Sequence, residues 1–115
     1  MSEKKPVISD DPLYQLLRDS KTGEFNERRA AGETCTLSGV DLRGVDLRGL
    51  DARGLDLSSS YLRQADLRGI DFSETNLEGA SIHGSKISGC LFPAELAPEE
   101  IALSLEHGTR MRYRR

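Results

Sequence analysis

A five-residue period governs the middle of this chain and restricts its fold more than any other feature. From Cys35 to Ala94 the sequence divides without a gap into twelve consecutive groups of five residues. The third position of each group is large and apolar in eleven of the twelve groups, and Ala52 is the exception. Neither a helix of about 3.6 residues per turn nor a strand with two-residue alternation has this period. The predicted core consists of these third-position residues: Leu37, Leu42, Leu47, Leu57, Leu62, Leu67, Phe72, Leu77, Ile82, Ile87 and Phe92.

Each group of five is explained as one short extended side followed by a turn. Alternation along an extended side points the first and third positions inward and the second position outward. The fifth position is Gly in eight groups, and Gly accepts the positive φ of a tight turn. Phe72 and Phe92 lie twenty residues apart, which indicates four sides per coil. Twelve groups then make three coils around a narrow axis.

The groups VDLRG, VDLRG, ADLRG, IDFSE and TNLEG resemble the pentapeptide-repeat family, whose motif is A(D/N)LXX. The resemblance covers residues 35–94. It implies a right-handed quadrilateral β-helix with four repeats per coil, which agrees with the twenty-residue spacing. The expected fold is therefore an all-β solenoid core of about three coils with short α-helical caps at both ends. This chain often has Val, Leu or Ile at the first position where the family prefers Ala, so its first coils are expected to be slightly wider.

The flanking segments predict helices that cover the ends of the coil. Asp11 and Pro12 form a helix start, a second helix is expected over residues 24–31, and a third is expected from Pro98 to Gly108. Such caps protect open strand edges from other chains. We expect one domain in three parts: an N-terminal helical cap or arm (1–34), a β-helix (35–94), and a C-terminal helical cap with a basic tail (95–115).

Residues twenty positions apart are expected to lie above one another in successive coils. This alignment places four arginines on two neighbouring sides and so predicts a stripe of arginines. Its four members have Asp46 and Asp66 between them, so the stripe either binds a carboxylate-rich or phosphate surface or is neutralised by these neighbours. The C-terminal tail is either a solvated, frayed end or a contact for an acidic partner or nucleic acid. The candidate partner-binding residues are Arg43, Arg48, Arg63 and Arg68 of the stripe and Arg110 and Arg112 of the tail.

Residues suited to catalysis or metal binding are sparse. Cys35 and Cys90 are expected to point inward, too far apart for a disulfide. His83 and His107 have no metal-ligand spacing, no Gly-rich phosphate loop is present, and no nucleophile has a neighbouring base. We therefore expect no catalytic, cofactor-binding or metal site, no cofactor, and no enzymatic activity.

The expected function is a non-catalytic structural or interaction module that binds a protein partner of unknown identity. A small-molecule substrate, a nucleic acid and a membrane are not expected as partners, and the net charge of -3 is not that of a basic nucleic-acid binder. Resemblance to longer, more acidic family members suggests an alternative, a DNA mimic that regulates or protects a topoisomerase such as DNA gyrase. The same resemblance suggests a homodimer formed through the C-terminal segment.

The expected location is the cytoplasm. No apolar run approaches the roughly 20 residues that span a bilayer, and the sequence begins without the hydrophobic stretch of a signal peptide. Two cysteines without an export signal are typical of a reducing compartment.

Overall fold

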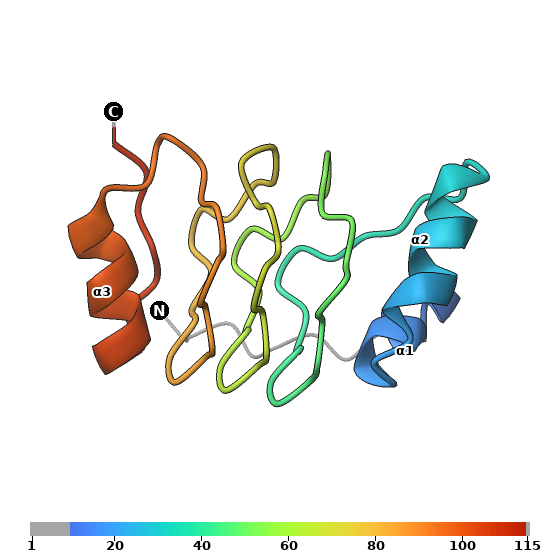
Figure 1. Ribbon diagram of the computed structural model, residues 1–115, viewed down its shortest axis with the longest axis horizontal. Helices are drawn as coiled ribbons and strands as arrows, with labels where there is room; N and C mark the ends of the chain where they lie inside the picture. Colours follow the sequence, from blue (N-terminus) through green and yellow to red (C-terminus); the bar gives the residue numbers. More distant parts are fainter. Residues whose placement is uncertain (1–9, 115) are drawn as a thin grey trace, which may run out of the picture.

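The computed structural model describes residues 10–114 and places helices at both ends of a coiled middle segment (Figure 1). Helices α1 (Pro12–Arg18) and α2 (Thr22–Ala30) lie at one end, and α3 (Pro98–His107) lies at the other. Residues 1–9 of the expected N-terminal arm and Arg115 of the tail lie outside the described residues. No helix among residues 10–114 is long and apolar enough to cross a bilayer.

Residues twenty positions apart pair along the middle segment. Backbone hydrogen bonds connect successive coils, as where Leu42 N donates to Tyr61 O at 2.9 Å and Leu62 N donates to Ser81 O at 2.8 Å. This pairing has the twenty-residue register that the sequence predicts. Each bridge is isolated because a side turns after about three residues. The parallel bridges join Asp41 to Tyr61, Asp46 to Asp66, Asp56 to Asn76, Tyr61 to Ser81, Asp66 to Lys86, and Asp71 to Leu91.

The fifth position adopts the left-handed turn conformation in ten of the twelve groups, two of which do not have glycine there; Glu74 and Ala94 are the exceptions. Gly44 has φ 75°, while Ser59 and Gln64, on consecutive corners, both have φ 58°. A residue with a Cβ is disfavoured in this region by about 1–2 kcal/mol. The hydrogen bonds between coils therefore impose the turn on these two residues.

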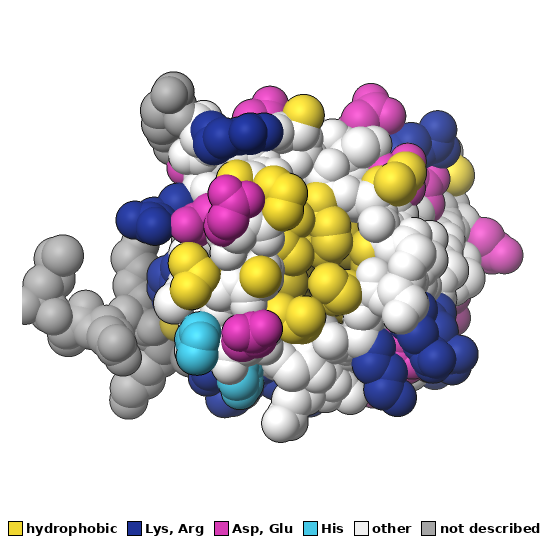
Figure 2. Space-filling view, turned by 60° about the vertical axis from the view of Figure 1, so that its left-hand side comes forward, with side chains coloured by type: hydrophobic (Ala, Val, Ile, Leu, Met, Phe, Trp, Pro, Cys, Tyr) yellow, Lys and Arg dark blue, Asp and Glu magenta, His cyan; other side chains and the backbone are white. Residues whose placement is uncertain are grey.

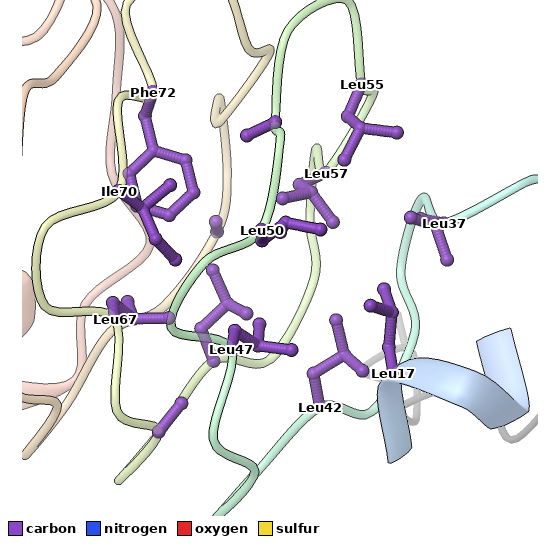
Figure 3. Close-up of a cluster of buried hydrophobic side chains, with 14 of the residues drawn as sticks. Leu17, Leu37, Leu42, Leu47, Leu50, Leu55, Leu57, Leu67, Ile70 and Phe72 are labelled. Atoms are coloured by element: carbon purple, nitrogen blue, oxygen red, sulfur yellow. The ribbon is translucent and has the colours of Figure 1, made fainter. Parts of the chain in front are cut away.

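The first and third positions point into the coil (Figure 3). The rings of Phe72 and Phe92 stack with their centroids 6.0 Å apart. Ile87 and Phe92, which belong to the predicted core, lie on the last two sides of the last coil and are only half-buried, whereas Leu77 and Ile82 on its first two sides are fully buried. Ala52 is also buried, and it lies twenty residues before Phe72, at the same position of the preceding coil. The other predicted core residues are fully buried: Leu37, Leu42, Leu47, Leu57, Leu62, Leu67, Phe72, Leu77 and Ile82.

The N-terminal helices differ from the sequence prediction in the bounds of α2, which spans Thr22–Ala30 where residues 24–31 were predicted. Helix α1 starts as predicted, with the side chain of Asp11 accepting a hydrogen bond from Leu13 N at 2.9 Å. Helix α2 starts at Thr22, so that Gly23, predicted to lie in the break, is helical. The break is confined to the residues around Ser20, which has φ 60°. The Thr22 hydroxyl donates to Arg48 O at 2.9 Å and fixes the start of α2 against the first coil.

The same helices cover the edge of the first coil. Figure 3 shows Leu17 of α1 pointing toward Leu37 and Leu42. Polar side chains of these helices supply hydrogen-bond partners for backbone groups of this edge. They include Tyr14 OH to Asp41 O at 2.6 Å, Asn26 Nδ2 to Gly49 O at 2.9 Å, Asp51 N to Asn26 Oδ1 at 2.9 Å, and Arg29 Nη1 to Arg53 O at 3.2 Å.

The C-terminal tail returns along the last coil after α3. Helix α3 begins at Pro98, as predicted, and Gly108 ends it with φ 76°. Met111 is fully buried, donates its N–H to Ala80 O at 2.9 Å and accepts from Gly79 N at 2.6 Å. The interpretation of the tail as a frayed end is therefore wrong for residues 110–114, although the residues Arg110, Arg112 and Arg114 are exposed to solvent.

Candidate functional site

Arginines at the fourth position of a group bind the aspartate at its second position. Each guanidinium donates from two of its nitrogens to the carboxylate two residues earlier, a strong and directional arrangement. The bonds to Arg53 and Arg68 lower the pKa of Asp51 and Asp66, each to about 2. The shortest distances are 2.7 Å for Arg43–Asp41, 2.8 Å for Arg48–Asp46, 2.9 Å for Arg53–Asp51 and 2.7 Å for Arg68–Asp66.

Three of the four candidate arginines in the predicted stripe are thus paired within the chain. Arg48 also reaches the next coil, with its Nε 3.4 Å from Asp66 Oδ2. This arrangement is the neutralising alternative considered from the sequence, in which acidic and basic columns offset one another. For Arg43, Arg48 and Arg68 the structure therefore provides little uncompensated charge.

Arg63 is the exception, because its group has Tyr61 at the second position. Its Nε and the Nδ1 of His83 are both buried, and neither has a hydrogen-bond partner within residues 10–114. The guanidinium lies against the end of α3, where a Cβ at Gly108 would collide with Arg63 Nη2. Arg43, Arg63, Gln64 and His83 line a hollow at this point.

The two candidate arginines of the tail bind other parts of the protein. Arg110 lies over the ring of Tyr61, 5.0 Å from its centroid, and donates to Gly79 O at 3.0 Å. Arg112 pairs with Glu100 of α3 at 2.9 Å, and its guanidinium holds the pKa of that carboxyl below the usual value. Both side chains hold the tail against the last coil and α3.

The C-terminal cap satisfies only part of the last coil's edge. In earlier coils most of the N–H groups at third and fifth positions donate to the next coil. In the described part of the chain, the N–H groups of Ile87, Gly89 and Phe92 have no such acceptor. The cap supplies acceptors on the first two sides of the last coil: Tyr113 OH for Leu77 N, Met111 O for Gly79 N, Ser104 Oγ for Ile82 N, and Leu105 O for Gly84 N.

Apolar side chains are exposed beside this open edge. Leu91 is 58% exposed, and Leu103 of α3 is 41% exposed. Figure 2 shows apolar side chains gathered near the centre of this end, with charged side chains around them. The sequence did not predict this surface, but it carries one signal for it: Leu91 takes the outward second position, where Asp is usual.

The remaining candidates for chemistry are structural. Cys35 and Cys90 are half-buried free thiols, and burial raises the pKa of both. Cys90 Sγ donates to Leu67 O at 2.9 Å. No group of three or more potential ligands that would hold a metal ion is found among the residues described.

Comparison with known proteins gives one match. A family model described as pentapeptide repeats matches residues 34–64 and 56–92, in eight copies. The two stretches together span more than half of the chain. No curated protein and no solved structure matches it.

Proposed function

Because this chain belongs to the pentapeptide repeat family, we propose that it is a non-catalytic interaction module that binds a protein partner at the open edge of its last coil. Family membership indicates a structural or interaction module of the repeat-protein class. The half-covered end is the observation that carries the more specific proposal. The partner adds an extended segment along residues 85–94.

The open edge has both components that such a segment requires. The N–H groups of Ile87, Gly89 and Phe92 need acceptors, and a strand added to a sheet edge supplies them. Leu91 and Ile87 provide apolar surface that the added segment covers. At the opposite end of the coil, the two N-terminal helices already provide hydrogen-bond partners for the backbone and cover for the apolar core. An exposed edge of this kind readily pairs with another chain.

We further infer that the coiled segment is a right-handed quadrilateral β-helix. The parallel bridges at a twenty-residue register support this fold, as does the burial of third-position side chains. A helix of this form exposes the edge of its last coil unless a cap covers all four sides. The proposed binding site follows directly from that geometry.

The charge arrangement does not favour the alternative function as a DNA mimic. Duplex DNA carries one negative charge per about 1.7 Å of its axis. On this protein Asp41, Asp46, Asp51 and Asp66 are each paired with an arginine. The sides of the coil therefore lack the continuous acidic surface that imitation of a duplex requires.

The test uses a substitution that should not disturb folding, because it introduces the residue that is most common at the second position of the repeat. Leu91→Asp places the usual second-position residue at this site and removes the exposed apolar side chain. Asp71→Asn is the matched control because Asp71 is the bridge partner of Leu91 one coil earlier and Asn preserves the acceptor for Ser73 N. Circular dichroism melts verify that both variants fold.

Affinity capture from cell extract is compared across the full-length wild-type protein and the two variants. We expect specific proteins to be retained by wild type and Asp71→Asn but lost with Leu91→Asp. Retention of the same proteins by all three would overturn the proposal. Light scattering over a concentration series tests a second copy as the occupant. A dimer in wild type that Leu91→Asp abolishes would replace the separate partner with a homodimer.

A further inference from the structure

We propose that Arg63 forms, together with His83, a binding site for a carboxylate group such as an acidic side chain. The site is the hollow that Arg43, Arg63, Gln64 and His83 line across the three coils, and the Arg63 guanidinium lies near Gly108 at the end of α3. It lies on a different side of the coil from the open edge at residues 85–94, so it is independent of the proposed function.

The other arginines of the coil show which ligand this position suits. Arg43, Arg48, Arg53 and Arg68 each occupy the fourth position of a group and bind a carboxylate from the second position. Arg63 occupies the same position in the fold, but Tyr61 replaces the aspartate. Its guanidinium is thus presented without a carboxylate from its own group.

The surroundings of Arg63 supply no full negative charge to replace that aspartate. No residue lining the hollow is acidic. Asp41, one coil earlier on this side, is already bound by Arg43 through both carboxylate oxygens. The C-terminal end of α3 contributes only partial negative charge. Arg110, over the ring of Tyr61, adds a further positive charge to this side.

The hollow accommodates a ligand and offers more than one polar contact. Its volume of about 270 Å³ is several times the roughly 30 Å³ that a water molecule occupies in the liquid. Arg63 Nε and His83 Nδ1 are both buried without partners among the described residues. A planar guanidinium matches the two oxygens of a carboxylate, and the four arginine–aspartate pairs of this chain make carboxylate, rather than phosphate, the expected group.

The experiment follows the arginine Nε–H signals of the full chain by nuclear magnetic resonance at pH 7. Sodium acetate is titrated against sodium chloride at equal ionic strength, with sodium phosphate and a triglutamate peptide as further probes. Arg53 Nε is the internal reference because Asp51 already occupies its guanidinium. Two variants complete the design: Tyr61→Asp supplies the missing carboxylate, and Tyr61→Asn removes the tyrosine without supplying a charge.

We expect acetate to produce a saturable shift of Arg63 Nε that chloride does not produce, while Arg53 Nε stays unchanged. Tyr61→Asp should reduce the response at least about fivefold, and Tyr61→Asn should keep most of it, because only the former forms an internal pair. Saturation at lower concentration with triglutamate identifies a polypeptide source, whereas equal responses per carboxylate identify a small carboxylate. Equal responses of Arg63 and Arg53, or stronger binding of phosphate than of acetate, would overturn the proposal.

Discussion

At the scale of single residues, the arginine–aspartate pairs make stability depend on acid pH. Hydrogen bonds from Arg53 and Arg68 lower the pKa of Asp51 and Asp66 to about 2 in the folded protein, below the value of about 3.9 in unfolded chains. The ionised carboxylates therefore favour the folded state above about pH 4, and this contribution is lost as the pH falls toward 2.

The expected result is a urea-unfolding free energy that is nearly constant from pH 7 to about pH 4 and decreases between pH 4 and 2. Asp66→Asn should flatten the acid limb, because the side chain of residue 66 then no longer titrates. Tyrosine fluorescence or circular dichroism during urea titration provides the measurement. An acid limb identical in wild type and variant would contradict the assignment to these pairs.

Sequence patterns predicted the stacking of charged residues but not their pairing. Stacking by twenties correctly placed Asp46 next to Asp66, which a parallel bridge now joins. The principal arginine contact, however, runs along the chain to the aspartate two residues earlier. Alignment of residues twenty positions apart compares neighbouring coils, so it does not detect a contact between residues two positions apart. The exceptional character of Arg63 follows from Tyr61 alone, once this local rule is known.

At the scale of secondary-structure elements, the tail contributes to stability through one buried side chain. Met111 is fully buried between α3 and the last coil. Met111→Ala should lower the unfolding free energy by about 2–5 kcal/mol, because the truncation leaves a cavity. Leu103→Ala is the control, since Leu103 is 41% exposed on α3. Thermal and urea denaturation measure both, and equal losses would show that burial of the tail is not decisive.

The ends of the helices were largely readable from the sequence, while the tail was not. Asp11 and Pro12 mark the start of α1, and Pro98 and Gly108 bound α3, because capping chemistry is local. The tail depends on tertiary contacts with Ala80 and Gly79. In the tail, arginine alternates with Met111 and Tyr113, and this two-residue period is typical of an extended segment. The high charge of the tail instead suggested a solvated end.

At the scale of the whole molecule, each coil contacts only its neighbours, so protection from solvent should vary along the axis. Leu62 N and Leu67 N donate to acceptors in the last coil and belong to the central one. The amides of Ile87, Gly89 and Phe92 have no acceptor among residues 10–114.

We therefore expect the slowest hydrogen exchange at the central coil and the fastest exchange within the last coil at the amides of Ile87, Gly89 and Phe92. The difference arises because opening from the uncovered end requires fewer contacts to break. Amide exchange followed by nuclear magnetic resonance gives the rates residue by residue. Uniform protection across the three coils would indicate a single cooperative unit and contradict the expected gradient.

The register of the whole coil was predictable, and the incomplete cover of its end was not. Repetition of one small unit fixes the register, so pairs such as Phe72 and Phe92, or Leu50 and Ile70, indicated the spacing. The cover depends on how far α3 and the tail reach around four sides, which no short pattern encodes. Only Leu91 at an outward position hinted at the open sides.

The four-sided register also determines the orientation of the two ends relative to each other. Inserting one group of five at a corner would advance every later residue by one side, rotating α3 by a quarter turn about the axis. Inserting twenty residues would lengthen the protein and restore the original alignment. The remainder after dividing the number of groups by four thus sets the angle about the axis between the open edge and the N-terminal helices. A change in that number would turn the open edge in steps of a quarter turn.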